Sequence, residues 1–389
     1  MKILYGYSNC TDRKYNEIFT NKSISVLQAD QKYHSLLING FAKNGVDMYC
    51  YSGLPINRQV TKKLVIREKQ EEENGVKYYY YTTLNLPILR QAMILMAAKR
   101  AAKKFKQEGK TFIVCDCLNR ANAIGLVKGA KKRKIPVIMI VTDLPEHQFS
   151  RKAAKKCNDL LQKADGYIFL TEQMNERVNK EGRPYVVLEG HADITLEDLN
   201  LEEKYEKTLA KKVIVYAGSI HRLYGIQNLV EGFLQANIVD AELHVFGDGD
   251  YREELERLAC LYPNLKYRGI CSNQEVVEVE QRATLLVNPR PPEPEYTKYS
   301  FPSKNMEYMV SGTPVLTTKL PGMPKEYYPY VYTIEEASVE GVEKALKSVF
   351  SESFEQRNKK GELARQFVLQ HKSNVVQAKK IIKFLEEMF

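Results

Sequence analysis

The stretch that decides the fold reads KVIVYAGSIHRLYGIQNLVEGFLQA and spans residues 212–236. Its apolar run at 213–216 predicts a buried strand, and residues 226–236 predict a helix. Gly218 lies between them, where the chain must turn from strand to helix. A strand followed at once by a helix is the repeating unit of a parallel α/β sheet. The stretch therefore predicts an α/β domain.

The same alternation continues towards both ends of the chain. Before this stretch, strands are expected at 3–7, 46–51, 76–82, 111–115, 137–142 and 166–170, and helices at 25–44, 89–107, 121–134 and 150–164. After it, strands are expected at 241–246, 265–268, 283–288 and 314–317, and helices at 252–261, 275–281, 303–310 and 373–388. This order predicts two Rossmann-like, doubly wound domains in tandem, with a ligand cleft at the carboxyl ends of their strands.

The boundary between the two domains is expected where the pattern lapses into the acidic, weakly apolar residues 197–204. We expect a first domain at 1–190 and a second at 205–372. The C-terminal helix, about 373–389, is expected to pack back on the first domain.

Composition excludes several classes of protein. The 389 residues are 44% hydrophobic and 27% charged, which rules out a mainly disordered chain and a polytopic membrane protein. The 7 cysteines are an odd number and scattered, so we expect reduced thiols in a cytoplasmic protein. Met1 begins a strand-like run that turns polar at once, so no signal peptide is expected.

The net charge of +10 is unevenly distributed. Residues 1–190 hold 33 Lys+Arg against 18 Asp+Glu, and residues 90–134 hold 13 basic and 2 acidic residues. Such a patch favours a polyanion. The predicted helix 89–107 carries the basic side chains Lys99, Arg100, Lys103 and Lys104 beyond an apolar half at 92–98.

An anionic membrane surface suits this basic, amphipathic helix. Its apolar run is far too short to span a bilayer, so the protein would lie on the membrane. Nucleic acid is disfavoured because no nucleic-acid-binding signature accompanies the charge. A plain solvated helix face is the alternative, and the apolar half could instead pack against the sheet of the first domain.

The candidate ligand site lies in the second half of the chain. Gly218 and Ser219 end a strand just before a helix, with Arg222 nearby, which is a weak phosphate-binding signal by itself. A stronger group begins at Ser300 and Phe301. There Ser303 is expected to be a helix N-cap, so that Lys304 and Glu307 share one face of the first turn.

This second group has the parts of a nucleotide diphosphate site. The helix start and Lys304 offer positive charge, and Glu307 offers two acceptors for ribose hydroxyls. Simple capping of the helix, with a solvated lysine, is the alternative that the residues alone leave open.

Residues 218–230 together with 299–315 resemble the donor domain of GT-B glycosyltransferases, in the large retaining family that includes sucrose synthases and bacterial capsule and cell-wall transferases. The likeness runs through the whole second half, including Gly247-Asp248-Gly249 and Asn288-Pro289-Arg290. The first half matches in architecture only. The resemblance implies Arg290 as a further donor-binding residue, and Asp143, Arg222 and Lys304 as catalytic residues.

Three positions depart from the family pattern. The first of two expected glutamates falls on Tyr299, an expected arginine falls on Ser219, and an expected lysine falls on Tyr224. The diphosphate charge would then be carried by Arg222, Arg290 and Lys304. Asp143 follows a strand in the first domain, where it would contact sugar or acceptor, unless it only forms the turn before Pro145. His34, His244 and His371 are isolated in the sequence and carry no expected role.

The resemblance implies retaining transfer of a hexose from a nucleotide diphosphate sugar, UDP-linked above all, to a glycan acceptor for a bacterial surface polysaccharide. No metal or other cofactor is expected, because Lys, Arg and a helix dipole would neutralise the leaving diphosphate. A lipid-linked acceptor at the inner membrane face is expected, and oligomerisation is left open. A nucleotide-sugar epimerase and a catalytically silent, glycan-binding partner subunit are the rival functions.

Overall fold

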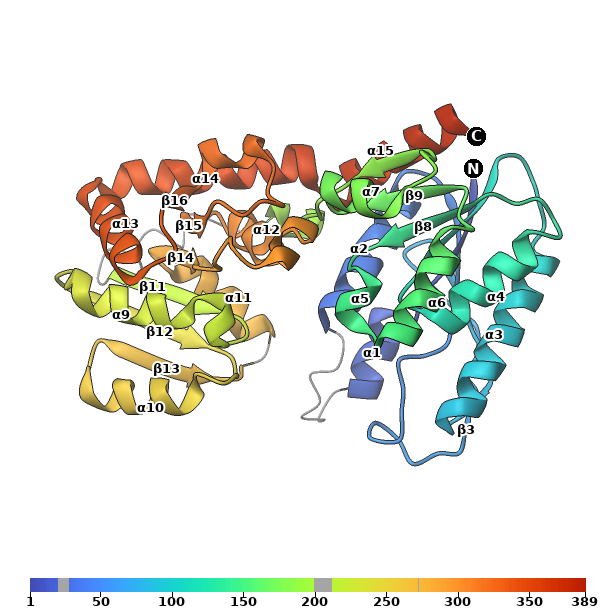
Figure 1. Ribbon diagram of the computed structural model, residues 1–389, viewed down its shortest axis with the longest axis horizontal. Coiled ribbons are helices and arrows are strands. Elements are labelled where there is room, and N and C mark those ends of the chain that lie inside the picture. The colour runs from blue at the N-terminus through green and yellow to red at the C-terminus, as the bar shows by residue number, and fades with distance from the viewer. Residues whose placement is uncertain (20–27, 199–211, 272) are drawn as a thin grey trace. The chain divides into compact units, whose positions relative to one another are not determined.

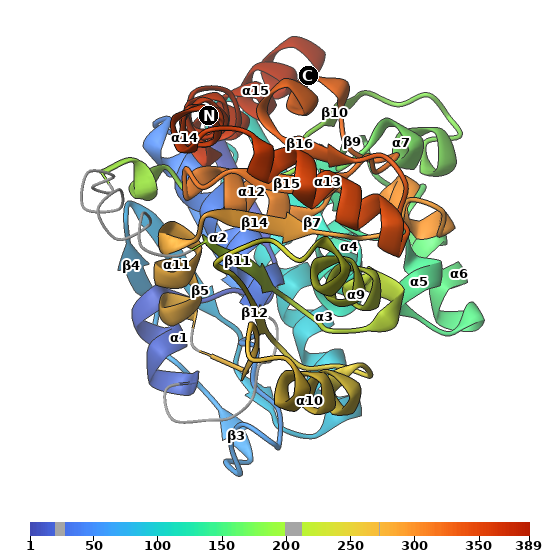
Figure 2. The same cartoon turned by 90° about the vertical axis from the view of Figure 1, so that its left-hand side faces the viewer.

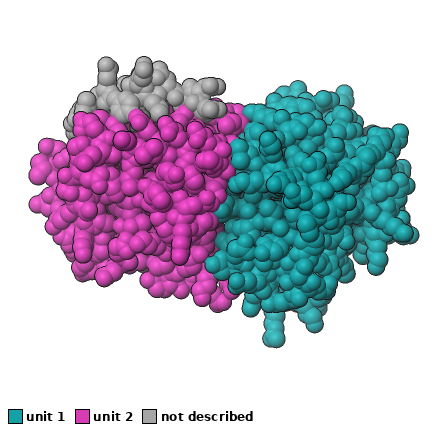
Figure 3. All heavy atoms as spheres, turned by 90° about the horizontal axis from the view of Figure 1, so that it is seen from above, with its two compact units in different colours: residues 1–191, 374–389 teal, residues 192–373 magenta. Residues whose placement is uncertain are grey.

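The computed structural model describes residues 1–19, 28–198, 212–271 and 273–389. The chain divides into unit 1, residues 1–191 with 374–389, and unit 2, residues 192–373 (Figure 3). The break at residue 191 lies one residue beyond the first domain expected from the sequence. The expected start of the second domain at 205, most of the acidic stretch and residues 25–27 of the expected helix 25–44 lie outside the described residues.

Unit 1 is built on an eight-stranded sheet in the order β10-β9-β8-β7-β1-β2-β5-β4 (Figure 1). Neighbouring strands are parallel, except that β4 pairs antiparallel with β5, and β3 and β6 form a separate antiparallel pair. The strands are β1 Lys2–Gly6, β2 Asp47–Ser52, β3 Val65–Ile66, β4 Glu71–Glu73, β5 Val76–Tyr80, β6 Thr83–Leu84, β7 Thr111–Asp116, β8 Val137–Val141, β9 Gly166–Phe169 and β10 Tyr185–Val187.

Helices cover both faces of this sheet. They are α1 Asp12–Phe19, α2 Gln28–Lys43, α3 Pro87–Lys104, α4 Arg120–Ala130, α5 Pro145–Gln148, α6 Arg151–Leu161, α7 Glu172–Val178 and α15 Asn374–Met388. Ile3 and Tyr5 share a buried cluster with α2 and α15. Gly6 points the other way, towards Leu126 of α4. Side chains alternate along a strand, so α2 and α15 lie on one face and α4 on the other.

Unit 2 contains a six-stranded parallel sheet in the order β13-β12-β11-β14-β15-β16. Its strands are β11 Lys212–Ala217, β12 Ala241–Phe246, β13 Leu265–Gly269, β14 Leu285–Asn288, β15 Val315–Thr318 and β16 Tyr332–Ile334. Its helices are α9 Ile226–Ala236, α10 Arg252–Leu261, α11 Asn273–Arg282, α12 Ser303–Val310, α13 Val339–Ser351 and α14 Phe354–Lys372, with short 3-10 turns η1 Ile194–Asp198, η2 Arg222–Tyr224, η3 Glu295–Tyr299 and η4 Lys325–Tyr330.

Two buried clusters sandwich the sheet of unit 2. One contains residues of α9, α10 and α13, and the other contains residues of α12 and α14 (Figure 2). The central strands are apolar without alternation because both of their faces are buried. The predicted α/β class with two parallel, doubly wound sheets is confirmed.

Several elements differ from the sequence expectation. The helix expected at 121–134 ends at Ala130, and Lys134 adopts a left-handed φ of 55°. Helices α13 and α14 and strand β16 were not predicted. In α14, Arg357 and Arg365 are buried and interrupt the apolar spacing that marks a helix. The Arg365 guanidinium donates to the backbone of Leu196 at 2.7 Å, which offsets its burial.

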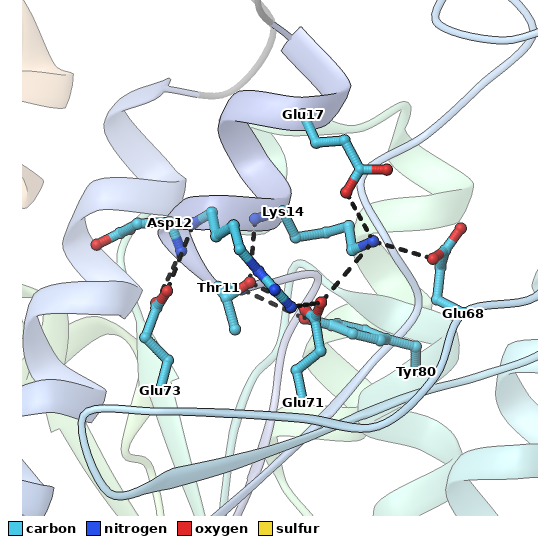
Figure 4. A network of polar contacts seen from close by, with 9 residues as sticks. Thr11, Asp12, Lys14, Glu17, Glu68, Glu71, Glu73 and Tyr80 are labelled. Carbon is cyan, nitrogen blue, oxygen red and sulfur yellow. Dashed lines mark hydrogen bonds and ion pairs between the residues drawn. The ribbon is translucent and has the colours of Figure 1, made fainter.

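A charged network ties α1 to strand β4 in unit 1 (Figure 4). The Lys14 Nζ lies 2.9 Å from Glu17, 3.0 Å from Glu68 and 3.8 Å from Glu71, and only 10% of the Lys14 side chain is exposed. The Glu73 carboxylate accepts the backbone N–H of Asp12 at 2.8 Å, which satisfies the first turn of α1. The positive charge of Lys14 and the negative charges of Glu17, Glu68 and Glu71 thus neutralise one another in a partly buried cluster.

Candidate functional site

Unit 2 contains a cavity of about 250 Å³ at the carboxyl edge of its sheet. Three segments meet there: the loop after β11, the residues ending β14, and the start of α12. The lining residues are 216–219, Tyr224, Asn288, Arg290, 301–304 and Tyr308. Six of the predicted donor-binding residues are therefore brought together, namely Gly218, Ser219, Arg290, Phe301, Ser303 and Lys304.

The loop after β11 is held by its neighbours. The Tyr216 hydroxyl donates to the Ser219 carbonyl at 2.7 Å, and burial raises the pKa of Tyr216, so it remains a neutral donor. Gly247 has a φ of 127°, and a Cβ there would lie 1.8 Å from the Gly218 carbonyl oxygen. Only glycine permits this close approach, which fixes the backbone of Gly218 at the cavity wall.

Buried hydrogen bonds position the start of α12 against the sheet. The Tyr308 hydroxyl accepts the Ala217 N–H at 3.0 Å and donates to the Ala217 carbonyl at 3.2 Å. The Asn288 amide donates to the Asn305 side-chain oxygen at 2.7 Å, and Asn305 donates in turn to Thr317 at 3.1 Å. All of these groups are buried, so the helix start is fixed relative to β11, β14 and β15.

Arg290 is oriented by an aromatic ring. Its guanidinium carbon lies 4.8 Å from the centroid of the Tyr224 ring and 6.0 Å from that of Tyr296. Its Nε is buried and has no hydrogen-bond partner among the described residues. Tyr224, at the position where the family resemblance leads one to expect a lysine, thus holds a cation beside the cavity.

Lys304 and Glu307 form an ion pair of 3.0 Å, as their spacing of three on one helix predicts. Burial alone would lower the pKa of Lys304, but the carboxylates of Glu307 and Glu280 outweigh it and raise that pKa. The side chains are 39% and 32% exposed, so both remain accessible to a ligand.

The expectation that Ser303 is the N-cap of α12 is wrong. Pro302 occupies the cap position, and Ser303 is the first helical residue. The fixed ring of Pro302 already gives the chain its turn into the helix, so a serine cap one residue later is not required. Ser303 nevertheless lines the cavity.

The structure does not bring every predicted residue to the cavity lining. Arg222 is exposed, with its guanidinium 4.7 Å from the ring centroid of Tyr251 and bonded to Gln227. Ser300 lies one residue before the lining segment, and Glu307 reaches the site through Lys304. Tyr216 and Tyr308 were missed, because a tyrosine at an apolar position of the pattern is usually only a core residue.

In unit 1, Asp143 comes two residues after the end of β8, at the carboxyl edge of that sheet. The neighbouring strand β7 ends in the buried Asp116, which accepts from Thr142 at 3.3 Å and pairs with His34 at 3.4 Å. The His34 Nδ1 shares a 2.6 Å hydrogen bond with the Tyr5 hydroxyl. His34 is therefore not isolated, because folding brings together residues far apart in sequence.

The four basic residues predicted to meet a membrane lie on α3, which packs along α4 (Figure 1). Ala98 and Ala102 of α3 lie against Gly125 and Gly129 of α4. A Cβ on Gly125 of α4 would lie 2.4 Å from a carbonyl of α3, so the two backbones nearly touch. Only part of the apolar surface of α3 is packed in this way, because Ile88, Leu89 and Met96 are 85%, 49% and 49% exposed. Among the described residues, no helix is long and apolar enough to cross one.

The cations of α3 lie near Lys132, which follows the end of α4. The pKa of Lys103 is lowered, first by repulsion from Lys132 and then by burial and by repulsion from Lys99. Within the part of the chain that the structure describes, Lys99, Arg100, Lys103 and Lys104 make no ion pair. Uncompensated positive charge of this kind favours an anionic partner.

Comparison with known proteins agrees with this geometry. Residues 198–367 match the family described as glycosyl transferases group 1. The matched residues make up most of unit 2, which is therefore a group 1 glycosyl transferase domain, and the chain has the GT-B fold.

Solved structures resemble this chain over its full length. HepE from Anabaena, in complex with UDP and glucose, is 15% identical, with all of both chains covered and a TM-score of 0.67. The apo form of WaaB, a lipopolysaccharide outer core galactosyltransferase, is 15% identical with all of both chains covered and a TM-score of 0.63. Sucrose-phosphate synthase from Thermosynechococcus elongatus is 15% identical with 99% of both chains covered and a TM-score of 0.68. No curated protein matches the chain in sequence.

Proposed function

We propose that this glycosyltransferase transfers a hexose from a UDP-sugar to a glycan acceptor, with retention at the anomeric carbon. The observation that carries the proposal is the convergence of Arg290, Lys304 and the start of α12 on one cavity in unit 2. These are the groups that a leaving diphosphate requires. The complexes of HepE with UDP and with UDP-glucose support UDP as the nucleotide.

The donor would bind with its diphosphate at the start of α12. Lys304 would turn from Glu307 to a phosphate oxygen, and the carboxylate of Glu307 would then accept hydrogen bonds from the ribose hydroxyls. The backbone of Gly218 and Ser219 would approach the phosphates from the opposite wall. Arg222, stacked on Tyr251, is left out of this site.

In the transfer step, the bond between the sugar anomeric carbon and the phosphate oxygen breaks. The acceptor hydroxyl attacks from the face that the phosphate leaves, and its proton passes to the departing phosphate. Arg290 and Lys304 would stabilise the charge that develops on the diphosphate, so we propose that no metal ion is needed. Asp143 is proposed to contact the transferred sugar or the acceptor.

The contact between Tyr224 and Arg290 argues against a catalytically silent subunit. Arg290 is stacked on Tyr224, the residue that departs from the family pattern, and its buried Nε has no hydrogen-bond partner among the described residues. A site that no longer bound a donor would not require an arginine held in this way. We interpret the departure as a rearrangement that moves the second cation from the β11 loop to the end of β14.

The test of this function is hydrolysis of UDP-glucose by the purified chain in the presence of EDTA. Slow release of UDP, with the first-formed sugar in the α configuration by NMR, supports a retaining, metal-independent transferase. Release that requires a divalent cation would refute metal independence. No UDP release, and no UDP binding by calorimetry, would refute the donor assignment.

For the acceptor, we propose a bacterial surface polysaccharide built on a lipid carrier at the cytoplasmic face of the membrane. WaaB, a lipopolysaccharide transferase, supports the surface glycan. The basic surface of α3 and α4 supports a membrane location through its charge, and the exposed Ile88, Leu89 and Met96 of α3 are apolar groups that a membrane surface could also contact.

The membrane proposal predicts that changing Lys99, Arg100, Lys103 and Lys104 to Gln reduces binding to anionic vesicles by roughly a hundredfold or more. Donor binding should not change, and high salt should mimic the variant because the attraction is screened. The matched control changes the four basic residues of α6, Arg151, Lys152, Lys155 and Lys156, to Gln. Equal co-sedimentation of the parent and the α3 variant would contradict a membrane role.

A further inference from the structure

A second cavity, of about 490 Å³, lies wholly within unit 1 at the opposite edge of its sheet from Asp143. It is formed where α4 ends, where β8 and β9 begin, and just before β10. Its apolar residues are Val127, Ile135, Pro136, Val137 and Phe389. Parallel strands begin at this edge, so the cavity is separate from the carboxyl edge where ligands of such sheets usually bind.

Four cationic side chains line this cavity: Lys131, Lys134, Lys163 and Arg183. They come from three different connections in the chain, after α4, after α6 and before β10. Lys131, Lys134 and Lys163 are exposed and make no ion pair with any described residue. Arg183 is bonded to Glu181 at 2.5 Å.

One carboxylate, that of Asp165, also lines the cavity. It accepts the Val137 N–H at 2.8 Å, so its position is fixed by the backbone of β8. Because Glu181 already neutralises Arg183, three lysines against this carboxylate leave the lining positive. The cavity thus combines an apolar floor with uncompensated positive charge at its rim.

Lysines after a helix also stabilise its negative end, and this accounts for some of the charge. It does not account for Lys134, which has a φ of 55°, where glycine or asparagine is far less strained. A lysine that holds this conformation keeps its ammonium group beside the cavity.

We propose that this cavity binds a phosphate group attached to an apolar moiety. The phosphate would lie among Lys131, Lys134 and Lys163, and the apolar part would lie against Ile135 and Phe389. An anionic phospholipid headgroup and a soluble phosphate ester share this chemistry. The cavity adjoins the basic end of α4, so a headgroup can reach it from the surface formed by α3 and α4. The inference does not depend on the donor site of unit 2.

The experiment compares two variants that remove the same charge. Lys134→Gln with Lys163→Gln alters the cavity, and Lys152→Gln with Lys156→Gln alters only the exposed surface of α6. Each is titrated with inorganic phosphate and glycerol 3-phosphate by calorimetry, and with phosphatidylcholine vesicles with and without phosphatidic acid by co-sedimentation. The cavity variant should bind at least one of these phosphate probes roughly tenfold more weakly, while the surface variant changes less than threefold.

The arms identify the source of the phosphate. Binding of the soluble probes indicates a free phosphate ester, and binding only of vesicles with phosphatidic acid indicates a lipid headgroup. Equal weakening by both variants would show diffuse attraction and overturn the proposal, as would failure of the parent to bind any probe. Lys134→Gly separates binding from folding, because it removes the cation while relieving the left-handed strain. It should melt no lower than the parent and still lose binding. UDP binding, measured in parallel, reports separately on unit 2.

Discussion

Replacing Lys304 by methionine tests the proposed donor site most directly, because methionine keeps the length of the stem and removes only the charge. The ion pair with Glu307 is 3.0 Å long, but its side chains are 39% and 32% exposed. Pairs this accessible contribute less than about 1 kcal/mol to stability, so the variant should fold normally. The same charge beside a leaving diphosphate should be worth about 3 kcal/mol in the transition state, which is roughly a hundredfold in kcat.

The measurements are turnover of UDP-glucose, calorimetric binding of uridine and of UDP, and the free energy of unfolding. Uridine should bind as in the parent, UDP more weakly, and turnover should fall most. The matched control is Lys347→Met on α13, which also breaks an intrahelical pair, with Glu343 at 2.6 Å, away from the cavity. If Lys304→Met turned over as fast as this control, the lysine would be merely solvated and the reasoning would be refuted.

Four other changes probe the donor site and unit 1. Glu307→Ala should weaken UDP binding by about 1.5–3 kcal/mol in calorimetry with the fold intact, and an unchanged Kd would disprove the ribose contact. Tyr224→Leu should release the guanidinium of Arg290 and raise the KM for UDP-glucose severalfold, whereas Tyr224→Phe, which keeps the ring, should not. Lys14→Met should lower the free energy of unfolding by about 1 kcal/mol in urea, because Glu68 loses its cation while Glu71 keeps Arg13 at 2.6 Å. Burial raises the pKa of Glu71, but hydrogen bonds from neighbouring groups outweigh it and lower that pKa, so its contribution should be present at pH 7 and lost as the pH falls below the ordinary glutamate range; Glu71→Gln should flatten this dependence.

The sequence predicted the fold well where apolar periodicity is strong. The strand 241–246 and the helices 226–236, 252–261 and 303–310 end at the residues expected. Helices α13 and α14 were not predicted. In α14, the buried Arg357 and Arg365 interrupt the apolar spacing. Apolar spacing reports only those elements that bury apolar residues, so an element that buries charge in hydrogen-bonded form escapes it.

For the candidate site, sequence reasoning placed the cations but not what orients them. Lys304 and Glu307 follow from helical spacing alone. The stacking of Arg290 on Tyr224, and the bonds of Tyr308 to Ala217, join segments more than sixty residues apart. Such contacts exist only once the sheet has formed. Arg222 is the opposite case: it is near Gly218 in sequence, yet its guanidinium lies over the ring of Tyr251 and does not line the cavity.

The return of α15 to unit 1 has a consequence for how the protein is made. Ile381 and Leu385 of α15 are fully buried in the same cluster as Ile3 of the first strand. A chain emerging from the ribosome therefore cannot close the core of unit 1 until its last helix has been synthesised, although unit 1 begins first. Unit 2, contiguous from 192 to 373, has all its residues available earlier. We expect the usual N-terminal-first order of co-translational folding to be inverted here. The incomplete unit 1, with the face for α15 still open, is then the species for which a chaperone would matter most.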